Sequence, residues 1–236
     1  NINLYTFVYF FFPFMAEEKE NKSERCLVVP RKALFGYNDE RAFSGFRTPE
    51  QLGFDMENVL QKHSFFGWRK TSKGDYDVEY DGNLKHFNPC GVYICDKKIF
   101  TFTRIGGEER LIGRNDINIS GHVIPEDAQG TSSYHQTFVE TLMREFWEEV
   151  ECKDNVLFHL PPLGYVNQES SAAIDRVHFG IVYLIWGSSQ NIKVSEKEKD
   201  IMTGSLKTIE EIENLQRPLE GWSKYTFEAV KKYLGK

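Results

Sequence analysis

Three carboxylates fall within five residues of this sequence, at Glu145, Glu148 and Glu149. In a helix, Glu145 and Glu149 would lie one above the other on a single face, with Glu148 on its flank. Like charges at that spacing destabilise a helix by about a few tenths of a kcal/mol, so a counter-charge is expected. A divalent cation such as Mg²⁺ or Mn²⁺, which prefers oxygen ligands, would supply it. Taken alone, these three glutamates are equally typical of a solvated helix face.

The residues around the carboxylates predict an amphipathic helix that carries them. Its apolar side would consist of Val139, Leu142, Met143, Phe146 and Val150, so the glutamates project from the other side. Before this helix, a short apolar segment runs into Gly121 and His122, as at the end of a strand. Backbone at such a position often faces a ligand, and this context favours a binding site over a solvated face.

The sequence of this helix also resembles a known motif. Residues 144–149, Arg-Glu-Phe-Trp-Glu-Glu, resemble the REUxEE core of the Nudix box, where U is a bulky aliphatic or aromatic residue. Residues 121–123, Gly-His-Val, resemble the segment that commonly opens the box. With the later strand at 176–183, the order of motifs is similar to a bacterial subgroup of predicted Nudix phosphoesterases, over about residues 25 to 236.

The resemblance departs from the family pattern at two positions. Gly130 matches the glycine that lies six residues before a box glutamate, but Gln136 occupies that glutamate's position. Glu151 occupies the position of the usual glycine after the core. In the alternative alignment, which we prefer because it fits a strand end, Gly121 is the opening glycine and residues 124–137 contain an insertion.

The resemblance implies a divalent-metal-dependent hydrolase that cleaves a phosphoanhydride bond of a nucleoside diphosphate derivative, with Mg²⁺ or Mn²⁺ as cofactor. Glu145, Glu148 and Glu149 would be both catalytic residues and metal ligands, and either Glu148 or Glu149 could act as general base. Arg144, the fourth residue of the catalytic set, would pair with a box glutamate and hold its orientation. A carboxylate-held metal suits this chemistry, because cleavage needs an activated water and positive charge on the phosphate oxygens.

Substrate contacts are predicted from the segments around the box. Residues 104–114 contain three arginines, at 104, 110 and 114, whose guanidinium groups could bind phosphate oxygens, although a solvated turn fits equally well. Asn167 and His178 could face a substrate cleft, but a single histidine entering a strand is more often structural. The candidate substrate-binding residues are Arg104, Arg110, Gly121, His122 and His178.

The remaining pattern predicts an α+β fold without regular βαβ alternation. Residues 91–95 and 99–103 read as a hairpin, and residues 176–186 read as a central strand, apolar on both faces. Residues 33–54 read as a loop in which Thr48 and Pro49 could open a short helix. The resemblance implies a Nudix-like α/β/α sandwich with a mixed β-sheet and an N-terminal elaboration.

One domain is predicted for residues 25–236, with 25–88 as the elaboration and 89–236 as the core. We expect residues 1–24 to be a tail, and the aromatic stretch 1–14 to precede the natural start at Met15.

The 236 residues are 40% hydrophobic and carry a net charge of −6, which argues against general nucleic-acid binding. The stretch 1–14 fits neither a spanning helix nor a signal peptide, so no membrane contact is expected. Four cysteines without zinc spacing indicate reduced thiols and a cytoplasmic protein. The expected partner is a small nucleotide or other diphosphate, and a homodimer is plausible.

Three other interpretations remain open. The two departures from the box suit a non-catalytic Nudix-fold protein that binds a nucleotide or acts as a sensor. A structural or interaction domain would need only a solvated acidic face. An enzyme like isopentenyl-diphosphate isomerase would need a reactive cysteine in the cleft, and the sequence puts no cysteine in an evident active-site context.

Overall fold

A computed structural model describes residues 25–69, 78–107, 109–152, 156–170 and 176–235, so the predictions for residues 1–24 lie outside the described residues. Its principal sheet runs in the order β13-β5-β4-β11-β10-β2, and further strands pair with β4, β5 and β11 outside this order. The strands are β1 Arg25–Pro30, β2 Gly45–Arg47, β3 Phe65–Trp68, β4 Leu84–Cys95, β5 Lys98–Arg104, β6 Asn115–Asp116, β7 Ile119–Ser120, β9 Val156–Phe158, β10 Gly164–Asn167, β11 His178–Gly187 and β13 Met202–Lys207. A small second sheet pairs β8 Val150–Glu151 with β12 Lys193–Val194.

Two strands, β4 and β11, form the centre of the sheet. They run parallel over nine residue pairs, from His86 opposite His178 to Ile94 opposite Trp186. Every residue of β4 is buried, as is most of β11, and this explains why residues 176–186 read as apolar on both faces. The neighbours β5 and β10 are antiparallel to them, so the sheet is mixed.

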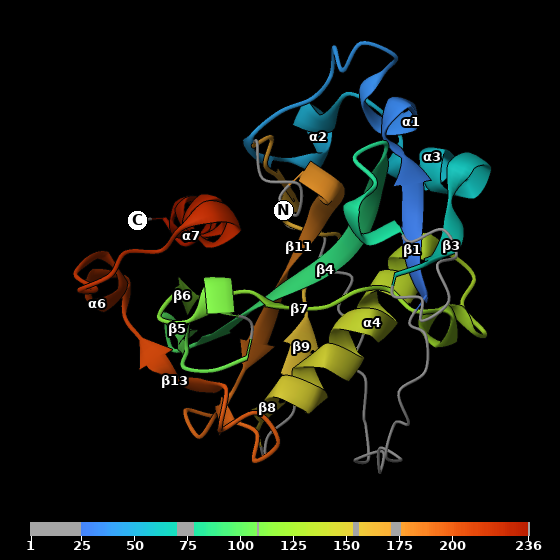
Figure 1. Cartoon of the computed structure of the whole chain (residues 1–236). Helices are drawn as coiled ribbons and strands as arrows, with labels where there is room; N and C mark the ends of the chain where they lie inside the picture. Colours follow the sequence, from blue (N-terminus) through green and yellow to red (C-terminus); the bar gives the residue numbers. More distant parts are fainter. Residues whose placement is uncertain (1–24, 70–77, 108, 153–155, 171–175, 236) are drawn as a thin grey trace.

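Helices cover both faces of this sheet. They are α1 Arg31–Phe35, α2 Pro49–Leu52, α3 Met56–His63, α4 Tyr134–Glu149, α6 Ile209–Glu213 and α7 Gly221–Tyr233. Along β4, Phe87 and Tyr93 belong to the core cluster that contains the apolar side of α4, whereas Val92 and Ile94 belong to the cluster with α6 and α7. Figure 1 shows α4 and α7 on opposite sides of the β4–β11 pair. The predicted α+β sandwich with a mixed sheet is confirmed.

Local signals account for several element boundaries. The hairpin between β4 and β5 turns on Asp96 and Lys97, which both have positive φ, as primed two-residue turns require. Thr48 caps α2 in a capping box with Gln51, and Pro49 is its first residue. These match the hairpin and the helix start expected from the sequence.

The N-terminal region differs from the prediction in two ways. Residues 33–54 are not all loop, because α1, β2 and α2 occupy part of them. The division placed between residues 88 and 89 falls inside β4, and β1 pairs with β4 in the principal sheet. Residues 25–88 are therefore joined to the rest by sheet hydrogen bonds. Among the described residues, no helix has the length and apolar character needed to cross a bilayer.

Candidate metal and phosphate site

The box helix is α4, and its start is fixed by polar contacts. The Ser133 side chain accepts a hydrogen bond from the Gln136 amide at 3.2 Å, which satisfies one of the free N–H groups of the first turn. Gln136 Oε1 in turn accepts from the amide of Ser132 at 3.0 Å. Gln136, which occupies the position of the missing box glutamate, therefore contributes to the start of the helix.

Glu149, at the other end of α4, is buried, with 9% of its surface exposed. Its Oε1 lies 3.7 Å from Arg104 Nη2, while its Oε2 has no hydrogen-bond partner among the described residues. Burial raises the pKa of Glu149 well above its usual value, Arg104 opposes the rise, and Glu145 and Asp116 add to it. The solvated-face interpretation is therefore wrong for Glu149.

Glu145 lies one turn earlier, against the backbone of Gly121. A Cβ on Gly121 would come within 1.9 Å of Glu145 Oε1, so a larger residue there would displace the carboxylate. Arg144 Nη1 donates to the same Oε1 at 2.6 Å. Burial raises the pKa of Glu145 despite that arginine. Glu148 is more open, with 38% of its side chain exposed, and it lies 3.5 Å from Arg144 Nη1.

Asp127 is the main partner of Arg144, and sequence reasoning missed it. Its carboxylate accepts from Arg144 Nε at 2.9 Å and from Nη2 at 3.0 Å, in the bidentate geometry typical of arginine and carboxylate. Asp127 also accepts from Thr141 Oγ1 and from the amide of Ile124. Burial alone would lower the pKa of Arg144, but the bonds to Asp127 and Glu145 raise it above its ordinary value. The guanidinium is therefore held in place between Asp127 and the box glutamates.

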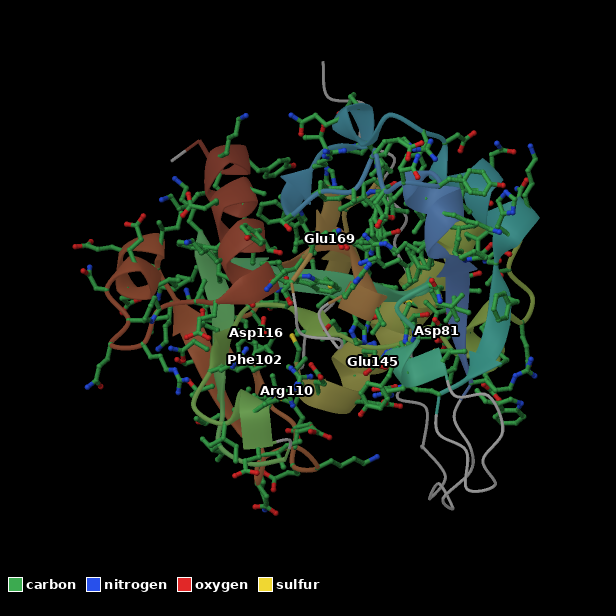
Figure 2. The ribbon with its side chains drawn as sticks, turned by 45° about the horizontal axis from the view of Figure 1, so that its top comes forward. Asp81, Phe102, Arg110, Asp116, Glu145 and Glu169 are labelled. Atoms are coloured by element: carbon green, nitrogen blue, oxygen red, sulfur yellow. The ribbon has the colours of Figure 1, made fainter. Side chains whose placement is uncertain are left out.

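A second missed carboxylate is Asp116, from β6. Its Oδ1 accepts from the amides of Ile117 and Asn118 at 2.7 and 2.8 Å and from the Ser223 hydroxyl of α7. Burial raises its pKa in spite of these bonds. Figure 2 shows Asp116 and Arg110 on the β5–β6 side of the region and Glu145 on the α4 side. No local signal marks Asp116, because its relation to α4 depends on how β6 pairs with β5.

Some of the predicted substrate-binding residues lie beside the carboxylates of α4, and others lie elsewhere. Arg104, at the end of β5, reaches Glu149, and Gly121 lies against Glu145. Arg110 is exposed in the short 3₁₀ turn Glu109–Leu111. Arg114, the third candidate from that loop, lies 3.8 Å from Glu220.

His122 and His178 contact each other, with 3.1 Å between their Nε2 atoms. The His122 carbonyl also accepts from Arg144 Nη2 at 3.0 Å, which joins this pair to the box helix. Burial lowers the pKa of His122 well below its usual value, helped by Arg69 and His178, so its imidazole is neutral at neutral pH.

The carboxylates at the end of α4 have the chemistry that a hard divalent cation prefers. Glu145 and Asp116 are near enough to raise the pKa of Glu149, and Oε2 of Glu149 lacks a hydrogen-bond partner in the described part of the chain. Among the described residues their oxygens do not form a group of three within 4.8 Å, so the side chains would have to close around an ion. Among the described residues, Arg144 pairs with Asp127 and Glu145, and Arg104 faces Glu149. Buried like charges of this kind need a counter-ion or a proton. An ion such as Mg²⁺ or Mn²⁺ matches these oxygen ligands.

No protein-family model matches the sequence, and no curated protein gives a significant match. Among solved structures, the chain is similar to Tm1382, a protein assigned to the Nudix hydrolases, with 27% identity and a TM-score of 0.64 over 89% of this chain and 100% of that one. It is also similar to the NUDIX domain of Shewanella oneidensis NrtR, solved with ADP-ribose, at 15% identity and a TM-score of 0.47 over 64% of this chain and 88% of that one. A MutT hydrolase from Burkholderia pseudomallei matches at 19% identity and a TM-score of 0.44, over 62% and 98% of the two chains.

Proposed function

Because this chain belongs to the Nudix hydrolase superfamily, we propose that it cleaves a phosphoanhydride bond of a nucleoside diphosphate derivative, using Mg²⁺ or Mn²⁺. The observation that carries the proposal is the buried Oε2 of Glu149, which has no hydrogen-bond partner among the described residues. In the described part of the chain, the carboxylates near that oxygen outnumber the arginines that pair with them, and a divalent ion would balance the excess charge.

Glu145, Glu148 and Glu149, the ligands expected from the sequence, would hold the ion together with Asp116, which lies near Glu149. When bound, the ion would supply positive charge to the phosphate oxygens and activate water. Arg144 acts by position, because its guanidinium, held by Asp127, fixes the direction of the Glu145 carboxylate. Glu148, the most exposed of the three, is suited to accept a proton from water. Arg104 would share its charge between Glu149 and a phosphate oxygen.

The substrate would enter beside Gly121, His122 and His178, with Arg110 nearer the solvent. A small nucleotide or other diphosphate is the expected partner, and general nucleic-acid binding is not. The cytoplasmic location and a homodimer stay predictions from the sequence.

The test is a Mg²⁺- or Mn²⁺-dependent phosphate-release screen, coupled to a phosphatase. Its panel would be nucleoside di- and triphosphates, nucleotide sugars, dinucleoside polyphosphates and NAD. We expect Glu149→Gln to lower kcat/KM by about 100-fold or more, since even residues that only orient a metal ligand contribute about 10–100-fold. Glu151→Gln is the matched control, because Glu151 lies two residues further on and pairs with Lys193 at 2.9 Å.

Equal activity of wild type and Glu149→Gln would overturn the mechanism. Metal binding by the wild type with no turnover across the panel would instead support the sensor interpretation, which the departures at Gln136 and Glu151 motivate.

A further inference from the structure

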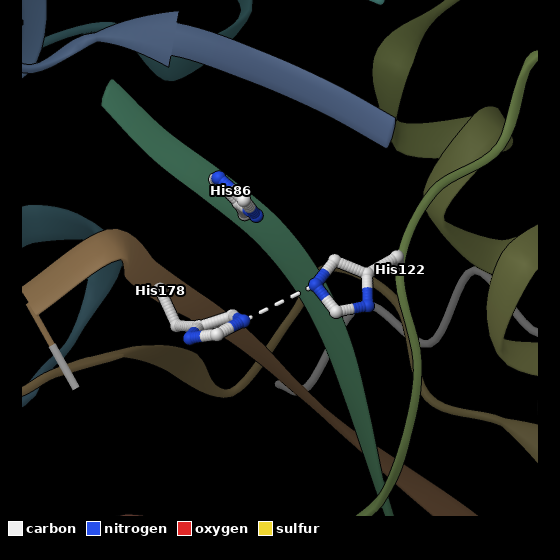
Figure 3. A group of neighbouring side chains, drawn as sticks. All are labelled: His86, His122 and His178. Carbon is white, nitrogen blue, oxygen red and sulfur yellow. Dashed lines mark hydrogen bonds between the residues drawn. The ribbon is translucent and has the colours of Figure 1, made fainter. Parts of the chain in front are cut away.

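Three of the six histidines in the sequence meet at one place outside the carboxylate cluster. Figure 3 shows His86 on β4, His178 on β11 and His122 on the segment after β7, with the rings of His122 and His178 in contact and His86 beside them. His86 and His178 are direct neighbours in the parallel pairing of the two central strands. Three separate parts of the chain therefore bring imidazoles together.

The spacing of these rings is close to that of metal ligands. One ligand atom from each histidine lies within 4.8 Å of the other two, and the Nε2 atoms of His122 and His178 are 3.1 Å apart. A tetrahedral zinc ion with Zn–N bonds of about 2.0–2.1 Å holds its ligand nitrogens about 3.3 Å apart. The Nε2 atoms of His122 and His178 are already close to that separation. A small movement of the His86 side chain would bring its ligand nitrogen to a similar distance from them.

The His86 ring is held in place on both sides. Its Nε2 lies 2.8 Å from the Val78 carbonyl, and its Nδ1 lies 3.7 Å from Cys26 Sγ. Both nitrogens therefore have partners, and an ion would replace one of these contacts, most simply the long one between Nδ1 and Cys26 Sγ, while Nε2 keeps the Val78 carbonyl. Histidine ligands in metal sites are oriented in this way, by a hydrogen bond from the second ring nitrogen.

We propose that His86, His122 and His178 form a second metal site, for Zn²⁺ or a similar first-row transition ion. Imidazole nitrogens suit such ions, whereas the carboxylates of α4 suit Mg²⁺ or Mn²⁺. His122 and His178 are half-buried, which gives the ion a route in and leaves a fourth position for water or an oxygen of a bound molecule. Because Gly121 lies against Glu145, the ion would stand at the border of the carboxylate cluster.

The test uses the full chain, stripped of metal with a chelator and titrated with Zn²⁺ by calorimetry in excess Mg²⁺. Co²⁺ serves as a second probe, because its visible absorption reports four-coordinate binding. We expect one equivalent of Zn²⁺ to bind to the wild type. His178→Gln and His122→Gln should each weaken binding by about 100-fold or more, since a ligand contributes at least as much as the residues that orient it.

Two controls make the outcome specific. His63→Gln removes an exposed histidine outside the cluster, and Glu149→Gln removes a carboxylate of α4, so both should keep full Zn²⁺ affinity. Thermal melts establish that the two cluster variants fold. Unchanged affinity in those variants, absence of Zn²⁺ binding by the wild type, or loss of binding in Glu149→Gln would each overturn the proposal.

Discussion

Two buried polar clusters in this protein differ in how their charges are balanced. Around Lys85, which is fully buried, Glu169 Oε1 lies at 3.2 Å and Asn167 Oδ1 at 2.7 Å. Glu169 also pairs with Arg31 at 2.7 Å, and Arg31 pairs with Asp39. Two cations thus meet two carboxylates. At the end of α4, several carboxylates share too few cations and Glu149 Oε2 has no partner in the described residues.

The pKa directions show the same contrast. Burial raises the pKa of both Glu149 and Glu169, but the bonds from Arg31 and Asn167 bring that of Glu169 below its ordinary value. Burial lowers the pKa of Lys85 to about 8, and Glu169 opposes this shift. A balanced cluster is complete without a ligand, whereas an unbalanced one is suited to bind a cation. Figure 2 shows Glu169 well apart from Glu145.

A large loss of stability is expected for Glu169→Gln. This change leaves Lys85 and Arg31 without their shared carboxylate, and breaking a buried ion pair typically costs about 3–5 kcal/mol. Because a quarter of the Glu169 side chain is exposed, we expect a loss of about 3 kcal/mol in the free energy of unfolding. Denaturant titration measures it, with the exposed Glu228→Gln as control. If the two variants lose equal stability, Glu169 does not balance the cluster.

Replacing Glu149 by glutamine should have the opposite effect in the metal-free protein, because it should raise the free energy of unfolding. The folded state holds the Glu149 proton more tightly than the unfolded state, so its contribution is present below the unfolded pKa and is lost as pH rises through the folded pKa. At pH 8 we expect Glu149→Gln to be more stable than wild type by about 1 kcal/mol, the scale of a typical single substitution. The difference should shrink in acid.

Thermal melts in a chelator across a pH series measure this difference. Adding Mg²⁺ should then stabilise the wild type and have much less effect on Glu149→Gln, because a ligand that binds only the folded state raises its stability. If the difference in stability between metal-free wild type and Glu149→Gln does not change with pH, or is absent at pH 8, then the Glu149 carboxylate is balanced from within the protein.

The sequence predicted the parts of the molecule that depend on local patterns. The central strand at 176–186, the hairpin and the box helix all follow from apolar periodicity and turn residues. Asn167 looked like a cleft residue, but it is buried with Lys85, because its position depends on the pairing of β10 and β11. Asp127 and His86 were missed for a similar reason. Each meets its partners only through contacts between segments far apart in the chain.

The smallest effect is expected for Gln136→Glu, which restores the box glutamate. Arg144 already has a carboxylate partner in Asp127, and position 136 serves the start of α4, where a glutamate would still accept from the Ser132 amide. We expect the free energy of unfolding to change by no more than about 0.5 kcal/mol and kcat/KM to change by less than about twofold, because no transition-state contact is added.

Asp127→Asn is the matched contrast to Gln136→Glu. It breaks the bidentate pair with Arg144, so it should cost about 3 kcal/mol of stability and about 10–100-fold in kcat/KM. Denaturant titration and steady-state kinetics on the substrate found in the screen measure both variants. If Gln136→Glu raised kcat/KM tenfold while Asp127→Asn left it unchanged, Asp127 would not be the residue that positions Arg144, and the missing glutamate would be a real defect of the site.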